Sequence, residues 1–185
     1  MLDNLIIKYA SPTLTGIKTG NLFKISNNDT IDLNKEIENY NLLLNCLDLY
    51  LDIVYSCDKY SLIYIYRLKM LLNDLDNKDV MSFLKSCGYN GFTVKEHISY
   101  LKNRFELINS TPHEVGIFLG YPLNDVKCFI KFKGKNFKIS GCWKVYDNVN
   151  YCRNKFESFK KCKEILSYLY KQDYPLESLV FIGNQ

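Results

Sequence analysis

The chain has 185 residues, of which 47% are hydrophobic and 24% are charged, and its formal net charge is +4 at pH 7. This length and composition predict one soluble globular domain, 1–185, that buries roughly 70% of the surface exposed by the unfolded chain. They exclude a membrane-spanning or secreted protein, because no apolar run reaches about 18 residues and no basic, cleavable leader is present, so we expect a cytoplasmic protein.

The first two thirds of the chain predict several helices around one β-hairpin. Two runs rich in β-branched and aromatic residues, 51–56 and 61–66, flank a four-residue turn, which is typical of a hairpin. Residues 11–20 predict a loop, because they contain one proline and two glycines. The other elements predicted in this part are a strand at 22–25 and helices at 2–9, 30–47, 67–76, 78–86 and 93–108.

The last third predicts a second β-ribbon and the longest helix. Phe137, Ile139, Trp143 and Val145 share one parity, which is typical of a strand pair bent at Gly141. Apolar residues at helical spacing predict a helix over 149–171, and an apolar run predicts an edge strand at 179–182. The predicted fold class is therefore α+β: a single domain with a β-hairpin, a second β-ribbon and several covering helices.

The cysteines and the uneven charge narrow the function classes. The seven cysteines are odd in number and contain no C-x-x-C pair, so we expect free thiols rather than a disulfide scaffold or a zinc ribbon. Residues 127–185 hold 12 Lys and Arg against 5 Asp and Glu. This basic third forms either a solvated lysine-rich surface or a surface that attracts phosphate, nucleic acid or an acidic protein. The common phosphate-loop, dinucleotide and hydrolase motifs are absent from the sequence.

One segment combines a helix start with a histidine. Thr111 at the N-cap, Pro112 at the first helical position and Glu114 at the third predict a short helix that ends at Gly120, and a second helix follows over 124–132. The cap explains Glu114 but leaves His113 free for a structural hydrogen bond or for proton transfer near neutral pH. A metal site is not predicted, because the second histidine of the metalloprotease helix is missing.

Two further features surround this segment. Gly116 is unfavourable inside a helix, so we expect a backbone or a ligand to approach it closely. Aromatic rings and lysines nearby favour a site for a planar or anionic ligand, although packing in the core is the simpler explanation for Trp143. The residues predicted to bind a ligand are Thr13, Lys18, Tyr121, Trp143, Lys144 and Tyr146.

These residues resemble a bacterial family catalogued as domain of unknown function 3793, and the resemblance spans nearly the whole chain. It rests on Ser11-Pro12-Thr13-Leu14 with Gly16 and Lys18, on His113-Glu114 with Gly116, Phe118-Leu119-Gly120-Tyr121-Pro122, Asp125 and Val126, on Gly141 with Trp143-Lys144-Val145-Tyr146, and on Lys161-Cys162. The resemblance implies no activity, substrate or cofactor. Genes of similar proteins often lie near flavodoxin and ferrous-iron uptake genes, which implies a redox or iron-homeostasis setting.

Three functions follow as hypotheses. The first is a cytosolic accessory module that binds a small anionic or planar ligand, or a protein partner, between residues 11–18, the His113 helix start and the Trp143 strand. The second is a small enzyme in which His113 is the general acid or base and Glu114 orients it. The third is nucleic-acid binding through the basic last third. The first two require these segments, distant in sequence, to meet around one hollow.

Overall fold

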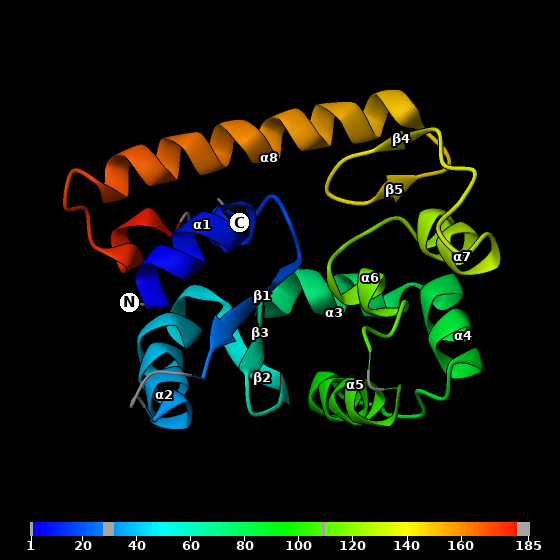
Figure 1. The fold of residues 1–185 in the computed structure, drawn as a ribbon, viewed down its shortest axis with the longest axis horizontal. Coiled ribbons are helices and arrows are strands. Elements are labelled where there is room, and N and C mark those ends of the chain that lie inside the picture. Colours follow the sequence, from blue (N-terminus) through cyan, green and yellow to red (C-terminus); the bar gives the residue numbers. More distant parts are fainter. Residues whose placement is uncertain (1, 28–31, 109, 181–185) are drawn as a thin grey trace.

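The computed structural model of the chain describes residues 2–27, 32–108 and 110–180 and has an α+β fold. A three-stranded antiparallel sheet lies in the centre, helices cover both of its faces, and a two-stranded ribbon lies at one end of the molecule (Figure 1). The predicted fold class is therefore confirmed. Across the described ranges, no helix combines the length and the apolar character that crossing a bilayer requires.

The central sheet separates two hydrophobic cores. Its strands are β1 (Gly20–Ser26), β2 (Leu49–Ser56) and β3 (Tyr60–Arg67), in the order β1-β3-β2. β2 and β3 form the predicted hairpin. Alternate side chains of β3 enter different cores, with Ile63 and Ile65 on one face and Tyr64 and Tyr66 on the other. Because both faces are covered, every residue of β3 after Tyr60 is buried.

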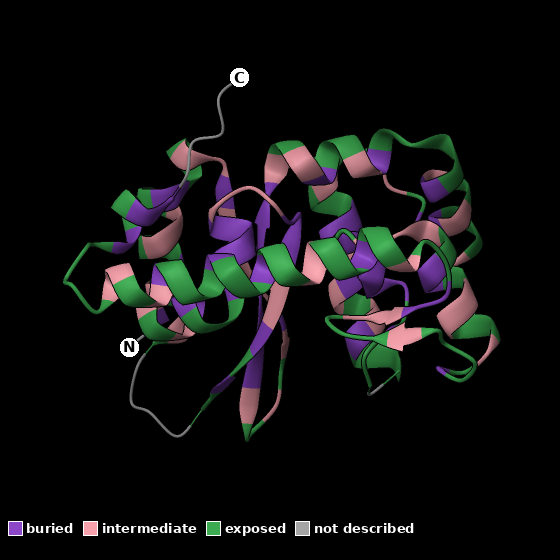
Figure 2. Cartoon of the chain, turned by 90° about the horizontal axis from the view of Figure 1, so that it is seen from above, coloured by how far each residue is buried: buried purple, intermediate pink, exposed green. Residues whose placement is uncertain are grey.

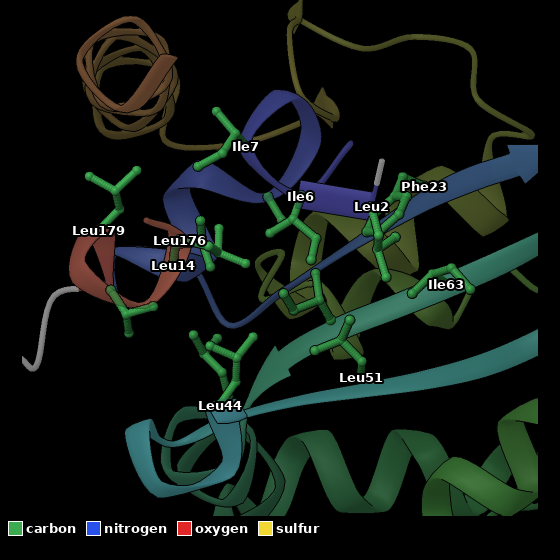
Figure 3. Packing of buried hydrophobic residues seen from close by; sticks show 14 of the residues in the cluster. Leu2, Ile6, Ile7, Leu14, Phe23, Leu44, Leu51, Ile63, Leu176 and Leu179 are labelled. Atoms are coloured by element: carbon green, nitrogen blue, oxygen red, sulfur yellow. The ribbon is translucent and has the colours of Figure 1, made fainter. Parts of the chain in front are cut away.

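The first core lies between the sheet and the elements nearest the two ends of the chain. These elements are α1 (Leu2–Leu14), α2 (Leu33–Leu44), the 3-10 helices η1 (Asn45–Leu47) and η2 (Leu176–Leu179), and α8 (Val149–Tyr170). Figure 3 shows Ile6 and Leu14 of α1 gathered in this core with Leu44 of α2 and Ile63 of β3. Full burial of such side chains contributes about 2 kcal/mol each and holds α1 on the sheet.

The second core lies on the opposite face of the sheet. It is covered by α3 (Leu68–Asp76), α4 (Lys78–Ser86), α5 (Val94–Ile108) and α6 (Val115–Phe118). The hydroxyl of Tyr64 donates a 2.6 Å hydrogen bond to the carbonyl oxygen of Phe118. The ring of Tyr89 packs on that of Phe118, with centroids 5.6 Å apart. These contacts fix α6, and the segment before it, against the middle of the sheet.

The remaining elements form the end of the molecule that carries the ribbon. They are α7 (Leu123–Lys131), β4 (Ile139–Ser140), β5 (Lys144–Val145) and the first half of α8. α8 has 22 residues and runs from the ribbon to α1 (Figure 1). Figure 2 shows that much of its outward side is exposed, whereas Cys152, Phe159, Cys162 and Leu166 are buried. The amphipathic pattern predicted this helix correctly to within one residue.

The structure corrects the predicted loop at residues 11–20. Residues 11–14 belong to α1, and Pro12 lies inside the helix. Burial decides the conformation here, because Ser11, Pro12 and Leu14 are all buried and the Ser11 hydroxyl donates to the carbonyl oxygen of Ile7. The carbonyl oxygen of Pro12 then accepts hydrogen bonds from the backbone of Ile17 and Lys18, at 3.0 and 3.1 Å, which turns the chain toward β1.

Three other predicted boundaries were wrong. The short helix begins at Val115, with Glu114 rather than Thr111 at its N-cap position. α2 begins at Leu33, and its N-cap Asp32 accepts from the backbone N–H of Lys35; residues 30 and 31 lie outside the described residues. The predicted edge strand at 179–182 begins in the 3-10 helix η2, and its last two residues are not described.

Candidate functional site

A cavity of about 330 Å³ lies between α6, α7 and the ribbon, and we call it the Trp143 pocket. Its walls come from residues 111–121, 125–129 and 140–144. Four of the predicted site residues line it: His113, Tyr121, Trp143 and Lys144. The expected meeting of the His113 segment with the Trp143 strand is therefore present.

A stacked aromatic pair forms one wall of this pocket. The rings of Tyr121 and Trp143 are 4.8 Å apart between centroids and inclined by 27°. The ring of Phe156, from α8, meets Trp143 edge-on at 4.6 Å. Gly141 makes this contact possible, because a Cβ at this position would collide with the Phe156 ring. Trp143 is half-buried, so its side chain both packs against Phe156 and lines the pocket.

Gly116 leaves room for the ring of Tyr121 beside α6. A Cβ at Gly116 would lie 2.8 Å from Cγ2 of Val126 and 3.1 Å from Cδ2 of Tyr121, which is too close for any larger residue. The expected close approach is therefore real, and it comes from two side chains rather than from another backbone. Gly120 has φ +72° after the last helical turn, as predicted for the residue that ends the helix.

Asp125 is a site residue that the sequence reasoning missed. Its side chain is buried, and its Oδ2 accepts a 2.8 Å hydrogen bond from the indole N–H of Trp143. Its Oδ1 accepts from the backbone N–H groups of Tyr146 and Asp147, at 2.8 and 3.2 Å. The carboxylate thus joins α7 to the ribbon. The sequence held one signal for such a residue, the single tryptophan, because the indole N–H of a half-buried tryptophan needs a hydrogen-bond acceptor.

His113 and Glu114 face different surroundings. Oε1 of the buried Glu114 accepts a 2.7 Å hydrogen bond from Nε of Arg104, and the Tyr89 hydroxyl lies 3.4 Å from the same oxygen. This bond raises the pKa of Arg104. His113 is exposed at the pocket wall, where its ring meets Phe129 edge-on at 5.0 Å. The carboxylate that was expected to orient the imidazole is therefore engaged by a guanidinium.

Two predicted residues of the ribbon differ in their roles. Lys144 is half-buried in the pocket wall, and its ammonium donates a 2.7 Å hydrogen bond to the carbonyl oxygen of Gly134. Tyr146 is buried in the core, outside the pocket, and its ring stacks on Phe132 at 5.9 Å. Burial raises the pKa of Tyr146, and its hydroxyl has no hydrogen-bond partner among the described residues.

The two predicted residues nearest the start of the chain do not line the Trp143 pocket. Thr13 is fully buried, and its hydroxyl donates to Oδ1 of Asn21 at 2.8 Å. Lys18 is 5% exposed, its ammonium donates a 2.7 Å hydrogen bond to the carbonyl oxygen of Gly20, and burial lowers its pKa to about 7. The same ammonium lies 5.2 Å from the centre of the Tyr121 ring.

Lys18 lines a second cavity, of about 340 Å³, between α1 and α8. We call it the lysine hollow, because Lys8, Lys160 and Lys163 also line it. Tyr121 and Cys142 belong to the walls of both cavities. The segments around positions 18, 113 and 143 therefore meet, but they enclose two adjoining hollows instead of one.

The chain was compared with known protein families, curated proteins and solved structures. A family model described as "Protein of unknown function (DUF3793)" matches residues 6–180. The comparisons with curated proteins and with solved structures gave no match. The resemblance noted in the sequence is confirmed over nearly the whole chain, and the function has to follow from the geometry of the two hollows.

Proposed function

We propose that this chain, which belongs to the family described as "Protein of unknown function (DUF3793)", is a cytoplasmic accessory module that binds a small planar ligand in the Trp143 pocket. The observation that carries the proposal is that the stacked rings of Trp143 and Tyr121 both line one cavity of about 330 Å³. Small-molecule sites are usually concave, aromatic and of this order of size, with few polar groups.

The polar groups in the walls suit a ligand with a flat ring and an anionic or hydrogen-bonding edge. Lys144 supplies a positive charge, and its ammonium has further N–H donors besides the one that binds Gly134. His113 supplies ring nitrogens that can donate or accept a hydrogen bond. A ring lying along Trp143 would gain contact energy of about 1 to 3 kcal/mol from stacking.

Binding is favoured over catalysis by the position of Glu114. The enzyme hypothesis gave Glu114 the role of orienting His113, and Glu114 binds Arg104 instead. The enzyme hypothesis stays a prediction, as does nucleic-acid binding by residues 127–185. Nucleic-acid binding has a simple test, because the affinity for any oligonucleotide should fall steeply with salt.

The test of the proposal begins with protein purified from its native host. Native mass spectrometry is expected to show the chain carrying a small molecule. Trp143 is the only tryptophan, so its emission reports on the pocket directly. Titration with flat aromatic acids should change this emission with saturation.

Two variants locate the binding. Phe129→Ala removes a ring from the pocket and should weaken the affinity about tenfold, since a lost ring contact costs about 1.4 kcal/mol. Phe92→Ala removes a ring that is 98% exposed and lies outside the pocket, and it should leave the affinity unchanged. A bare chain from the native host, together with an emission that no compound alters, would contradict the proposal. A co-purifying protein would instead support the partner-binding form of the hypothesis.

A further inference from the structure

The lysine hollow gathers positive charge from three separate parts of the chain. Lys8 comes from α1, Lys18 from the turn before β1, and Lys160 and Lys163 from α8. No aspartate or glutamate lines the hollow, and within the described ranges none of these four lysines pairs with a carboxylate within 4.0 Å. A cleft walled by charge of one sign concentrates the field and attracts counter-ions of the opposite sign.

Lys18 places one of these positive charges inside the protein rather than on its surface. Its side chain is 5% exposed, and the carbonyl oxygen of Gly20 is its one hydrogen-bond acceptor in the described part of the chain. A buried ammonium with a single neutral acceptor is costly, and an anion in the hollow would offset that cost. The lowered pKa of Lys18, which burial causes, agrees with a site that lacks its counter-charge.

Flat apolar surfaces complete the walls. Tyr9 of α1 and Phe156 and Phe159 of α8 line the hollow, together with Tyr121. Tyr9 is held by stacking on Phe23, at 6.0 Å between centroids. The cavity of about 340 Å³ therefore combines charge with ring-sized apolar faces, which neither a bare ion nor an uncharged ring would use fully.

We propose that the lysine hollow is a second binding site, for a small phosphate monoester that carries a flat ring. The phosphate lies among the ammonium groups of Lys18, Lys160 and Lys163, and the ring lies against Tyr9 and Phe159. Lysine binds phosphate as a point charge with three donors, so several lysines at different angles suit a tetrahedral dianion. This site adjoins the Trp143 pocket, with Tyr121 and Cys142 in the walls of both, and does not depend on the function proposed for that pocket.

The test uses 1-naphthyl phosphate as the probe and isothermal titration calorimetry at about 0.15 M salt, where the Debye length is about 8 Å, as the measurement. The double variant Lys160→Gln/Lys163→Gln removes two exposed charges of the hollow and should weaken the affinity at least about tenfold. The matched control is Lys155→Gln/Lys161→Gln, which removes two charges from the same helix outside the hollow. It should change the affinity less than about twofold, since screening by salt weakens distant charges.

Three outcomes would overturn the inference. The first is wild-type affinity in the Lys160→Gln/Lys163→Gln variant, and the second is an equal loss in both double variants, which would indicate unspecific attraction to the basic helix. The third is equal affinity for 1-naphthol, which lacks the phosphate.

The variant Phe129→Ala tells binding in the lysine hollow from binding in the Trp143 pocket. Unchanged affinity for 1-naphthyl phosphate supports the lysine hollow, and a loss there would place the probe in the other cavity.

Discussion

Asp125 shows how a single buried carboxylate can hold a site together. It accepts hydrogen bonds from the indole of Trp143 and from two backbone N–H groups, and a long one, at 4.0 Å, from the thiol of Cys152. Asp125→Ala should lower the free energy of unfolding by about 3 kcal/mol, because it leaves buried donors without an acceptor. Urea unfolding measures this loss. Asp125→Asn retains one acceptor oxygen and should lose less; an alanine variant as stable as wild type would contradict this role.

Lys18 predicts a dependence of stability on pH. Burial lowers its pKa from 10.5 to about 7, so below about pH 7 the native state holds a buried ammonium at full cost. Between about pH 7 and 10.5 the native state loses this proton while the unfolded chain keeps it, and stability therefore rises with pH. The Lys18→Met variant should gain the most free energy of unfolding over wild type below about pH 7, and this gain should become smaller above that pH.

The measurement for Lys18 is urea unfolding at several pH values from about 6 to 9. The matched control is Lys161→Met, because Lys161 is exposed and lies on the outer part of α8. Its difference from wild type should not change with pH over this range. A difference between Lys18→Met and wild type that is equally independent of pH would show that Lys18 keeps its ordinary pKa.

At the scale of elements, the pair of Glu114 and Arg104 ties α5 to the start of α6. Arg104→Met leaves the buried carboxylate of Glu114 without its partner and should cost about 3 kcal/mol of the free energy of unfolding. Adding Glu114→Ala should restore part of this loss, and a double-mutant cycle measures the coupling. His113→Ala, one position earlier on an exposed side chain, should cost less than about 0.5 kcal/mol. Additive effects of Glu114→Ala and Arg104→Met would contradict the pairing.

The sequence predicted elements well where the local pattern of apolar residues is clear. The ribbon and α8 follow from periods of two and of 3.6 residues, and the hairpin follows from two runs rich in β-branched and aromatic residues. It failed where burial overrode local turn chemistry. Pro12 lies inside α1 because the segment is packed under α8 and the sheet, and Glu114, expected to cap the helix after Thr111, accepts a hydrogen bond from Arg104 instead.

The sequence predicted the part of the candidate site whose residues lie close together in the chain. His113, Tyr121, Trp143 and Lys144 lie within 32 residues and meet in one pocket. The sequence could not show that the ring of Tyr121 would separate Lys18 from them, nor that Tyr146 would face the core. Such outcomes depend on tertiary packing, between Lys18 and Tyr121 in the first case and between Tyr146 and Phe132 in the second, and no local period records that packing.

For the whole molecule, the two cores share β3, whose alternate residues belong to one or the other. We therefore expect the chain to unfold as one cooperative unit. The transition seen by the emission of Trp143, at the ribbon end, should coincide in urea with the transition seen by far-UV circular dichroism. An earlier transition in the emission would show that the ribbon and α7 unfold as a separate unit.

Cys142 lies in the walls of both cavities, and its thiol is free. The residue as a whole is exposed, and partial burial at the two cavities raises the pKa of its thiol, so at neutral pH it should react more slowly with alkylating reagents than a fully solvated thiol. An occupant of either cavity would cover the sulfur further and slow the reaction again. The rate of alkylation at this one position is thus a chemical footprint for two kinds of occupant, readable by peptide mass even before either compound has been identified.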